Sequence, residues 1–409
     1  MMWFMIAGFV IANPVRKTIE VDGIEREYLV YTPSSPFSEK AAGIMVCLHG
    51  FGRTMNDFFD EYKITDVADS LNLVIVAPQA LPEQSKNINA EALIISAATD
   101  NPLVLNAVWG CGLRVRANLL VLGTTLLNEE LNKNVDDVAF IDRTIDEVIA
   151  DYSLQTDNIF MLGTSMGGFM TYQYALEKGE RLSGIISIAG SMGLNIRGLD
   201  YSKKIPVCDF HSVTDEVVPY TGSQLLSLPV FSSALTFVNV TLAKPVSDVI
   251  DYWSETNSTG NPIKEQIQYY PSANGITVEK FTYPHPEHEV IHYKINGAKH
   301  SYFFKKDNGD CMDHVEEISR FIQAHLTGIT HNTPIVTEQK LSFYPNPVSD
   351  KVFFNTTNGI ISVYDLTGRV VYSQSFNEGY VDLSCLNPGI YMIRVQSGKT
   401  VQTGKLVKN

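Results

Sequence analysis

A serine inside a Gly-x-Ser-x-Gly turn is the strongest chemical signal in this chain. The turn is Gly163-Thr164-Ser165-Met166-Gly167, and it joins an apolar run, Ile159 to Leu162, to a helix-like run, Phe169 to Leu176. Strand, tight turn and helix in this order form an elbow that lifts a serine hydroxyl clear of a sheet, with room only for small residues on either side. The pattern predicts that Ser165 is a nucleophile that attacks an ester or amide carbonyl.

A serine hydroxyl needs a base to take its proton at neutral pH. In a fold with this elbow, the acid and then the histidine follow the serine along the chain. Asp215 lies just after the strand-like run Val207 to Phe210, and His300 lies after another, Val290 to Ile295. Loops that follow parallel strands meet at the carboxyl edge of the sheet. The sequence therefore predicts a catalytic triad of Ser165, Asp215 and His300.

Other carboxylates and histidines are weaker candidates for the acid and the base. Asp209 lies inside its strand and Asp251 on a helix-like run. His285 and His288 fall in a Pro-rich polar loop that is expected to face solvent, and His292 falls within a strand.

Acyl transfer also needs hydrogen-bond donors for the developing oxyanion. The backbone N–H of Met166, directly after the nucleophile, is one donor by geometry. The segment Leu48-His49-Gly50-Phe51-Gly52 follows an early strand, and its glycines let the backbone approach a ligand. We expect the second donor to be the N–H of Phe51 and the side chain of His49 to pack under this loop.

Composition and charge limit the possible partners. The chain has 409 residues, of which 44% are hydrophobic and 19% charged, which is typical of a globular protein with more than one domain. Its net charge of −14 argues against nucleic acid or an anionic membrane as the main partner. From Thr337 onward 7 Lys and Arg residues face 5 Asp and Glu residues, whereas the preceding residues are strongly acidic, so a domain boundary is expected near this point.

The cysteines match no metal-ligand spacing. The predicted serine mechanism implies neither a metal nor an organic cofactor. The five are Cys47, Cys111, Cys208, Cys311 and Cys385. Cys47 and Cys208 lie in apolar runs and are expected to be buried thiols, while a pairing of Cys111 with Cys311 stays open.

The first twelve residues, Met1 to Ala12, are an apolar run that is too short to span a bilayer. The run resembles the hydrophobic part of a secretory signal but lacks the positive residues that precede it. We expect a partial signal segment over residues 1–12, from a misplaced start codon or an atypical leader. The alternative is a buried first strand.

Residues 17–326 are predicted to form one α/β domain with a doubly wound, mostly parallel sheet, because strands and helices alternate along them. The expected strands are Lys17 to Val21 and Ile24 to Thr32 (joined by the hairpin turn Asp22-Gly23), Ile44 to Leu48, Leu73 to Ala77, Ile159 to Leu162, Gly184 to Ala189, Val207 to Phe210 and Val290 to Ile295; the expected helices are roughly Asn56 to Leu71, Asp137 to Tyr152, the run after Ser165, and Asp313 to Leu326. Two stretches, Pro82 to Asn134 and Leu228 to Lys244, look like long loops. Such loops are usually lids or binding loops, so substrate contacts are expected there.

A linker over 327–340 and a small β-sandwich over 341–409 are predicted next. The chain becomes rich in Thr, His, Asn and Pro, and short strands separated by turn dipeptides follow. The expected strands are Val352 to Phe354, Ile360 to Tyr364, Val370 to Tyr372, Tyr380 to Asp382, Ile390 to Val395 and the last residues.

Residues of about 20–326 resemble the α/β-hydrolase esterases that include polyhydroxybutyrate depolymerases and feruloyl and acetylxylan esterases. The matching stretches are Leu48-His49-Gly50, Asp136 to Ile141, Gly163 to Gly168, Asp215-Glu216-Val217-Val218-Pro219-Tyr220 and Lys299-His300. The resemblance implies the nucleophile, acid and base named above. Lys299 stands where a glycine is common, and Ser212 follows His211 where a glycine is common. These departures do not touch the triad but leave the substrate open. Trp253 matches a family tryptophan and is expected in the core.

The tail resembles the C-terminal sorting domain of type IX secretion. The matching stretches are Phe343 to Asp350, Asp365 to Val371, Leu386 to Tyr391 and Lys405 to Lys408. The resemblance implies export by the type IX machinery, which would be a partner, and a secreted or surface-attached protein. A carbohydrate-binding module is the alternative, but it would need exposed aromatic residues, and Tyr364, Tyr372, Tyr380 and Tyr391 are expected in the core.

Together these observations predict a secreted serine esterase with no transmembrane span. Its expected substrates are feruloyl or acetyl esters on plant polysaccharide. The alternatives are a polyester depolymerase, a peptidase of the same fold and a catalytically inactive surface binding protein.

Overall fold

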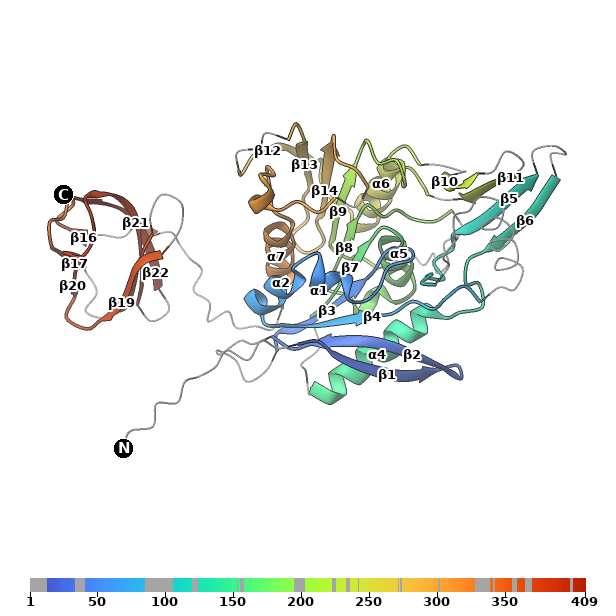
Figure 1. Cartoon of the computed structure of the whole chain (residues 1–409), viewed down its shortest axis with the longest axis horizontal. Helices are drawn as coiled ribbons and strands as arrows, with labels where there is room; N and C mark the ends of the chain where they lie inside the picture. Colours follow the sequence, from blue (N-terminus) through green and yellow to red (C-terminus); the bar gives the residue numbers. More distant parts are fainter. Residues whose placement is uncertain are drawn as a thin grey trace. The chain divides into compact units, whose positions relative to one another are not determined.

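The chain divides by its internal contacts into two compact units, Met1–Thr327 and Gly328–Asn409 (Figure 1). The computed structural model describes residues 13–33, 41–84, 106–119, 124–152, 154, 158–194, 203–222, 226–232, 236–241, 243–270, 272, 274–300, 302–327, 339–340, 343–354, 359–364, 370–397 and 400–409. The expected signal segment, residues 1–12, lies outside the described residues, as does most of the expected linker.

The main sheet of the first unit has the order β1-β2-β4-β3-β7-β8-β9-β14-β13-β12. Its strands are β1 (Val15–Val21), β2 (Ile24–Tyr31), β3 (Gly43–Leu48), β4 (Leu73–Pro78), β7 (Ile159–Thr164), β8 (Gly184–Ile188), β9 (Val207–Ser212), β12 (Ile263–Ile267), β13 (Thr277–Tyr283) and β14 (Val290–Asn296). The strands from β4 to β14 in this order pair in parallel. Antiparallel strands extend the sheet at both ends. The predicted mostly parallel sheet is therefore confirmed.

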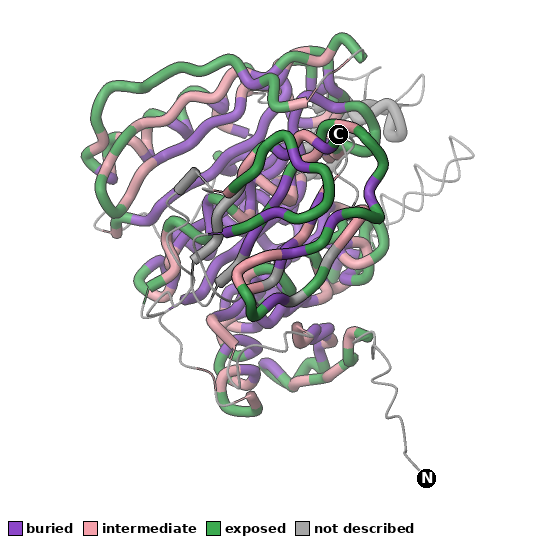
Figure 2. The backbone as a smooth tube through the Cα atoms, turned by 90° about the vertical axis from the view of Figure 1, so that its left-hand side faces the viewer, coloured by how far each residue is buried: buried purple, intermediate pink, exposed green. Residues whose placement is uncertain are grey.

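Helices cover both faces of this sheet (Figure 1). They are α1 (Asp57–Asp60), α2 (Ile64–Leu71), α4 (Asp137–Tyr152), α5 (Met166–Lys178), α6 (Val246–Asn257) and α7 (His314–His325), with 3-10 turns at Gly179–Arg181 and Lys306–Asn308. Apolar residues of α4, α5 and α6, Trp253 among them, pack against one face, and those of α1, α2 and α7 pack against the other. All residues of β3, β4 and β7 are buried, as continuous apolar runs in a parallel sheet require. Figure 2 draws the buried backbone in purple.

One expected helix is broken in two. The apolar spacing from Asn56 to Leu71 indicated a single helix, but Lys63 adopts a φ of 50°, in the left-handed region. A residue there cannot continue a right-handed helix, so α1 ends before it and α2 begins at Ile64.

The two stretches expected to be loops contain strands that pair with each other. Pro82 to Asn134 contains β5 (Arg114–Leu119) and β6 (Thr124–Glu130), while β10 (Leu226–Ser232) and β11 (Thr236–Thr241) lie in or next to the second stretch. These strands form a separate sheet in the order β10-β11-β5-β6, with β11 antiparallel to β5. The sequence suggested long loops here and missed these strands, because the pairing of β11 with β5 joins two stretches that are far apart in the chain.

The cysteines are all free thiols. Cys47 and Cys208 are buried in strands, as predicted. Cys111 and Cys311 pack in different core clusters, on opposite faces of the main sheet, so the pairing that the sequence left open does not form.

The second unit consists of two sheets that share one core. One has the order β15-β22-β21-β18-β19 and the other β16-β17-β20. The strands are β15 (Gln339–Lys340), β16 (Phe343–Tyr344), β17 (Lys351–Phe354), β18 (Gly359–Tyr364), β19 (Val370–Phe376), β20 (Tyr380–Asp382), β21 (Gly389–Ser397) and β22 (Thr400–Lys408). Val352 and Val381 of the small sheet pack with Ile361, Ile393 and Leu406 of the large one. This arrangement is the predicted β-sandwich.

The tyrosines of this unit do not form its core, contrary to the sequence prediction. Tyr364, Tyr372, Tyr380 and Tyr391 are each half-buried, and the centre of the core is aliphatic and phenylalanine-rich. Tyr380 instead lies 5.7 Å from the ring of Phe353, which lies 5.7 Å from the ring of Tyr344. Phe353 is 38% exposed and Tyr344 is 61% exposed, so an aromatic row lies on the open face of the small sheet.

A buried ion pair joins β2 to α4 in the first unit. Arg26 Nη2 donates to Asp137 Oδ1 at 2.6 Å, and both side chains are almost fully buried. The guanidinium also lies 3.9 Å from the centre of the Phe140 ring. The second oxygen of Asp137 accepts the backbone N–H of Gly110 at 2.7 Å. Both carboxylate oxygens thus have a donor, although burial outweighs these partners and raises the pKa of Asp137.

We predict that Asp137→Ala destabilises the first unit by about 3–5 kcal/mol, because it leaves the Arg26 charge buried and unpaired. Urea unfolding of the full chain measures this by tryptophan fluorescence, since all three tryptophans belong to the first unit. The control is Glu27→Ala, which removes an exposed partner of Arg16 and should cost less than about 1 kcal/mol. Equal costs for the two variants would contradict the prediction.

Candidate active site

Ser165 occupies the predicted elbow between β7 and α5. Its φ of 53° and ψ of −120° are strained for a residue with a side chain, as expected where a strand turns abruptly into a helix. A Cβ on Gly163 would lie 2.1 Å from the carbonyl oxygen of Gly167, and a Cβ on Gly167 would lie 1.9 Å from the carbonyl oxygen of Leu48. Only glycine fits at either position.

The structure brings Ser165, His300 and Asp215 together from the ends of three parallel strands. Ser165 Oγ lies 2.8 Å from His300 Nε2, and His300 Nδ1 lies 2.7 Å from Asp215 Oδ2 and 2.9 Å from Oδ1. A carboxylate can only accept, so the Nδ1–H of His300 donates to Asp215 and leaves Nε2 to accept from the serine hydroxyl. This is the geometry of a nucleophile, a base and an orienting acid.

Asp215 is held in its ionised form. Burial opposes ionisation, but the hydrogen bond and charge of His300 outweigh it, and the backbone N–H of Val218 and the charge of His211 add to the effect, so the pKa of Asp215 is lowered. Its Oδ1 accepts the N–H groups of Val217 at 2.8 Å and Val218 at 2.7 Å. The carboxylate therefore has a fixed orientation and a full negative charge at neutral pH.

The two N–H groups expected to stabilise an oxyanion lie on segments that touch the serine. Met166 begins α5, so its N–H has no partner within the helix. A Cβ added to Gly50, the residue before Phe51, would lie 3.3 Å from the Cβ of Ser165. In the part of the chain that the structure describes, neither the N–H of Met166 nor that of Phe51 finds an acceptor in the protein.

His49 supports this loop from beneath, as predicted. It is 1% exposed, and its Nδ1–H donates to the carbonyl oxygen of Gly50 at 2.8 Å. Its Nε2 accepts the N–H of Ala80 at 3.1 Å, which requires the neutral imidazole. Burial lowers the pKa of His49 to about 4, although the Gly50 hydrogen bond opposes the shift. Since backbone groups occupy both ring nitrogens, the neutral His49 supports the loop and has no lone pair left to take a proton from Ser165.

Trp109 holds the same loop from the other side. Its indole N–H donates to the carbonyl oxygen of His49 at 2.8 Å, and Ala107 accepts the N–H of Gly52 at 2.9 Å. Gly110, the next residue, is fixed by Asp137. The sequence placed Trp109 in a stretch expected to contact substrate, but it is fully buried and positions the loop instead.

The rival candidates lie apart from Ser165. Asp209 and His292 form a buried pair of their own, with 2.8 Å between Asp209 Oδ2 and His292 Nδ1. The other nitrogen of His292 lies 2.9 Å from the hydroxyl of Tyr220. Asp251 is exposed on α6, and His285 and His288 stack on each other in a loop, half-buried rather than solvent-facing.

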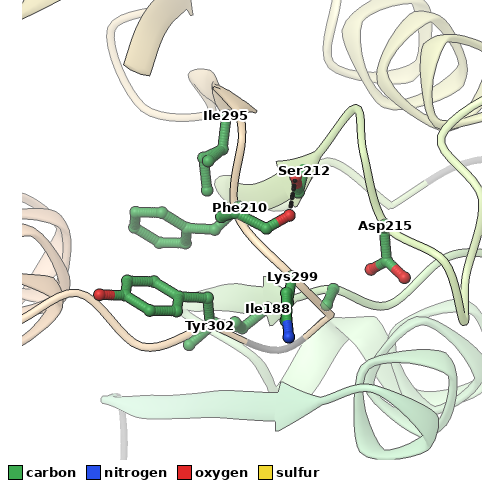
Figure 3. Close-up of a pocket in the computed structure, with 9 residues that line it drawn as sticks. Ile188, Phe210, Ser212, Asp215, Ile295, Lys299 and Tyr302 are labelled. Atoms are coloured by element: carbon green, nitrogen blue, oxygen red, sulfur yellow. Dashed lines mark hydrogen bonds between the residues drawn. The ribbon is translucent and has the colours of Figure 1, made fainter. Parts of the chain in front are cut away.

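A small pocket opens beside Asp215 at the ends of β8, β9 and β14 (Figure 3). In Figure 3 Phe210 and Tyr302 lie on one side of it and Asp215 on the other. The residues that line it are Ile188, Ala189, Phe210, Ser212, Asp215, Ile295, Ala298, Lys299 and Tyr302. Ser212 and Thr214 both donate to the carbonyl oxygen of Ala298, at 2.7 and 2.9 Å, and so tie the loop of the acid to the loop of the histidine.

Two parts of the chain match known protein families. Residues 128–244, which include the elbow and Asp215, match the phospholipase/carboxylesterase family of α/β-hydrolases, and residues 342–409 match the secretion system C-terminal sorting domain. The first unit is an α/β-hydrolase domain by its fold, and over residues 128–244 it is similar to carboxylesterases. The sorting domain makes this a secreted or cell-surface protein and implies the secretion machinery as a partner.

The hydrolase domain is also related to the feruloyl esterases. It is 28% identical over 116 residues to "Probable feruloyl esterase C" of Aspergillus niger, a match that covers 28% of this chain and 42% of the relative. It is 25% identical over 198 residues to the protein of that name from Aspergillus terreus, a match that covers 48% of this chain and 57% of the relative. The chain thus spans about half the length of these relatives or less. Among solved structures, an acetyl xylan esterase from Aspergillus awamori aligns with a TM-score of 0.46 and 11% identity, over 76% of this chain and 99% of that one.

No described group of three or more His, Cys, Asp or Glu side chains is arranged to hold a metal ion. No helix in the described ranges is both long and apolar enough to cross a membrane.

We predict that the first unit becomes less stable as the pH falls from 7 to 5, and that His49 contributes about 2 kcal/mol to this loss. The unfolded chain protonates His49 near pH 6.5, whereas the folded chain does so only near pH 4, so the unfolded state binds more protons between these values. Urea unfolding at both pH values measures the effect, and in His49→Gln the difference between them should shrink by that amount. Burial also lowers the pKa of His314, to about 3. His314 therefore adds the same loss of stability at low pH to the unmodified protein and to His49→Gln.

The control for this measurement is Trp109→Phe, which removes a hydrogen bond to the same loop without removing a titrating group. It should lower the free energy of unfolding equally at pH 7 and pH 5. A His49→Gln variant that keeps the full pH difference would contradict the prediction.

Proposed function

We propose that the hydrolase domain is a serine esterase in which Ser165 is the nucleophile, His300 the general base and Asp215 the orienting acid. The observation that carries the proposal is the continuous hydrogen-bonded line from Ser165 Oγ through His300 to a buried, ionised Asp215. A side chain hydroxyl on a strained elbow, next to two free backbone N–H groups, fits acyl transfer better than a structural role.

In the proposed reaction, Ser165 Oγ attacks the ester carbonyl while His300 Nε2 takes its proton. The N–H groups of Met166 and Phe51 then hold the oxyanion of the tetrahedral intermediate. His300 returns the proton to the leaving alcohol, and the acyl group stays on Ser165. Water, activated by the same nitrogen, releases the acid. Asp215 stabilises the imidazolium that forms in both halves of the cycle.

The substrate that we propose is a feruloyl or acetyl ester on plant polysaccharide. Relatives of the hydrolase domain are named feruloyl esterases. A protein with a secretion sorting domain meets substrates outside the cell, where polymers that cannot be imported must be cut. A polymer-linked ester is therefore consistent with the hydrolase domain and with the sorting domain. We also propose that the protein is exported by the type IX route.

We predict that the full-length protein hydrolyses 4-nitrophenyl acetate, methyl ferulate or acetylated xylan, and that Ser165→Ala lowers kcat by at least about 10⁴-fold. Asp215→Asn should cost on the order of 10⁴-fold, because an amide in place of the carboxylate favours the wrong tautomer of His300. Steady-state rates on the three substrates give both the role of the triad and the preferred ester.

A matched control is Asp209→Asn, which changes the neighbouring buried carboxylate that pairs with His292. This variant should lose stability but keep kcat within about tenfold, because Asp209 does not contact His300. Equal losses in Asp209→Asn and Asp215→Asn, or turnover that survives in Ser165→Ala, would refute the assignment. The absence of both turnover and fluorophosphonate labelling of Ser165 would favour a binding protein instead.

A further inference from the structure

His211 lies fully buried beside the triad, with both ring nitrogens facing carbonyl oxygens. Nδ1 is 3.1 Å from the carbonyl oxygen of Gly190, and Nε2 is 2.8 Å from that of Val218. A carbonyl oxygen only accepts, so each nitrogen makes a hydrogen bond only when it carries a proton. A neutral imidazole has one N–H and would turn a lone pair toward one of the two oxygens. The surroundings of His211 therefore suit the doubly protonated, positively charged ring.

The carboxylate of Asp215 supplies the balancing charge. Its Oδ2 lies 3.6 Å from His211 Nε2, and neither side chain has any exposed surface. Burial alone disfavours a charged histidine, but two hydrogen bonds and a nearby carboxylate oppose that cost. Val218 links the two groups, because its N–H donates to Asp215 while its carbonyl oxygen accepts from His211.

We propose that His211 is a permanent imidazolium that shares the Asp215 carboxylate with His300 and thereby keeps His300 unprotonated, and so active as a base, at lower pH. His211 is then a positioning residue, since it acts through Asp215 and does not touch the reacting atoms. The inference rests on the proposed esterase function. Its physical basis is competition: a carboxylate already facing one cation stabilises a second cation less, so proton uptake by His300 becomes harder.

The other ionisable groups around His211 do not replace this interaction. The neighbouring ionisable groups lie on two strands and in the loops that follow them. Asp209 is on the same strand as His211, and His292 and Lys294 are on β14. Asp215 and Tyr220 are in the loop after β9, and His300, in the loop after β14, pairs with Asp215. Asp209 is engaged by His292 and by the hydroxyl of Tyr172. Lys294 lies over the ring of Tyr220, with Nζ 5.7 Å from the ring centre. Asp215 is thus the carboxylate that the structure places against His211.

The first test is the pH profile of kcat/KM for His211→Gln, measured on the full chain with 4-nitrophenyl acetate. Without the positive charge, Asp215 should stabilise protonated His300 more strongly, and the acidic limb should move to higher pH by on the order of one unit. The control is Tyr220→Leu, which loosens the packing of the His211 ring without removing its charge. It should lower the unfolding midpoint and leave the acidic limb in place. An unshifted limb in His211→Gln, or an equal shift in both variants, would overturn the proposal.

The second test needs neither a substrate nor a folded variant. Nitrogen-15 NMR of the unmodified, histidine-labelled protein at pH 7 should show both ring nitrogens of His211 protonated. A single neutral tautomer would overturn the proposal. The labelling rate of Ser165 by a fluorophosphonate separates this result from the esterase assignment. A protein that is not labelled fails as a serine hydrolase whatever the charge of His211, whereas a labelled protein with a neutral His211 fails only the present inference.

Discussion

The close approach of α5 to the end of β3 is the constraint on which the site depends. Gly167 rests against the carbonyl oxygen of Leu48 so tightly that a single methyl group would collide with it. This contact places the start of α5, with its free N–H groups, beside the loop that follows β3. One backbone contact therefore positions both the proposed nucleophile and the proposed oxyanion donors. The side chains of His49 and Trp109 hold the loop in the place that this contact sets.

Buried carboxylates with fixed partners recur on the face of the sheet that α4, α5 and α6 cover. Asp137 is paired with Arg26, Asp209 with His292, and Asp215 with His300 and His211. A buried charge is costly unless its hydrogen bonds are satisfied, so each pair strongly favours one arrangement of the elements that carry it. The first joins β2 to α4 and the loop of Gly110, the second joins β9 to β14, and the third assembles the triad. The same chemistry thus serves both the scaffold and the site.

Local patterns in the sequence were enough to predict the elements that position the triad. The elbow, the helix Asp137–Tyr152 and the strands before Asp215 and His300 each carry their signal within a few residues. The sheet of β5, β6, β10 and β11 escaped prediction because its central pairing joins segments more than a hundred residues apart. The break at Lys63 depends on a backbone angle that the residue type does not reveal. The role of Trp109 and the pairing of Asp209 with His292 are likewise contacts between distant segments.

What separates His300 from the buried histidines His49, His211, His292 and His314 is the partner of its second nitrogen. His49, His211 and His292 have both nitrogens engaged by backbone or side-chain groups, and all three are buried. His314 is enclosed by aromatic rings, and burial lowers its pKa to about 3, so it stays neutral. His300 has a carboxylate on one nitrogen, a serine hydroxyl on the other and a side chain that is 15% exposed. A base must exchange protons with substrate and water, and this combination of partner and access allows it.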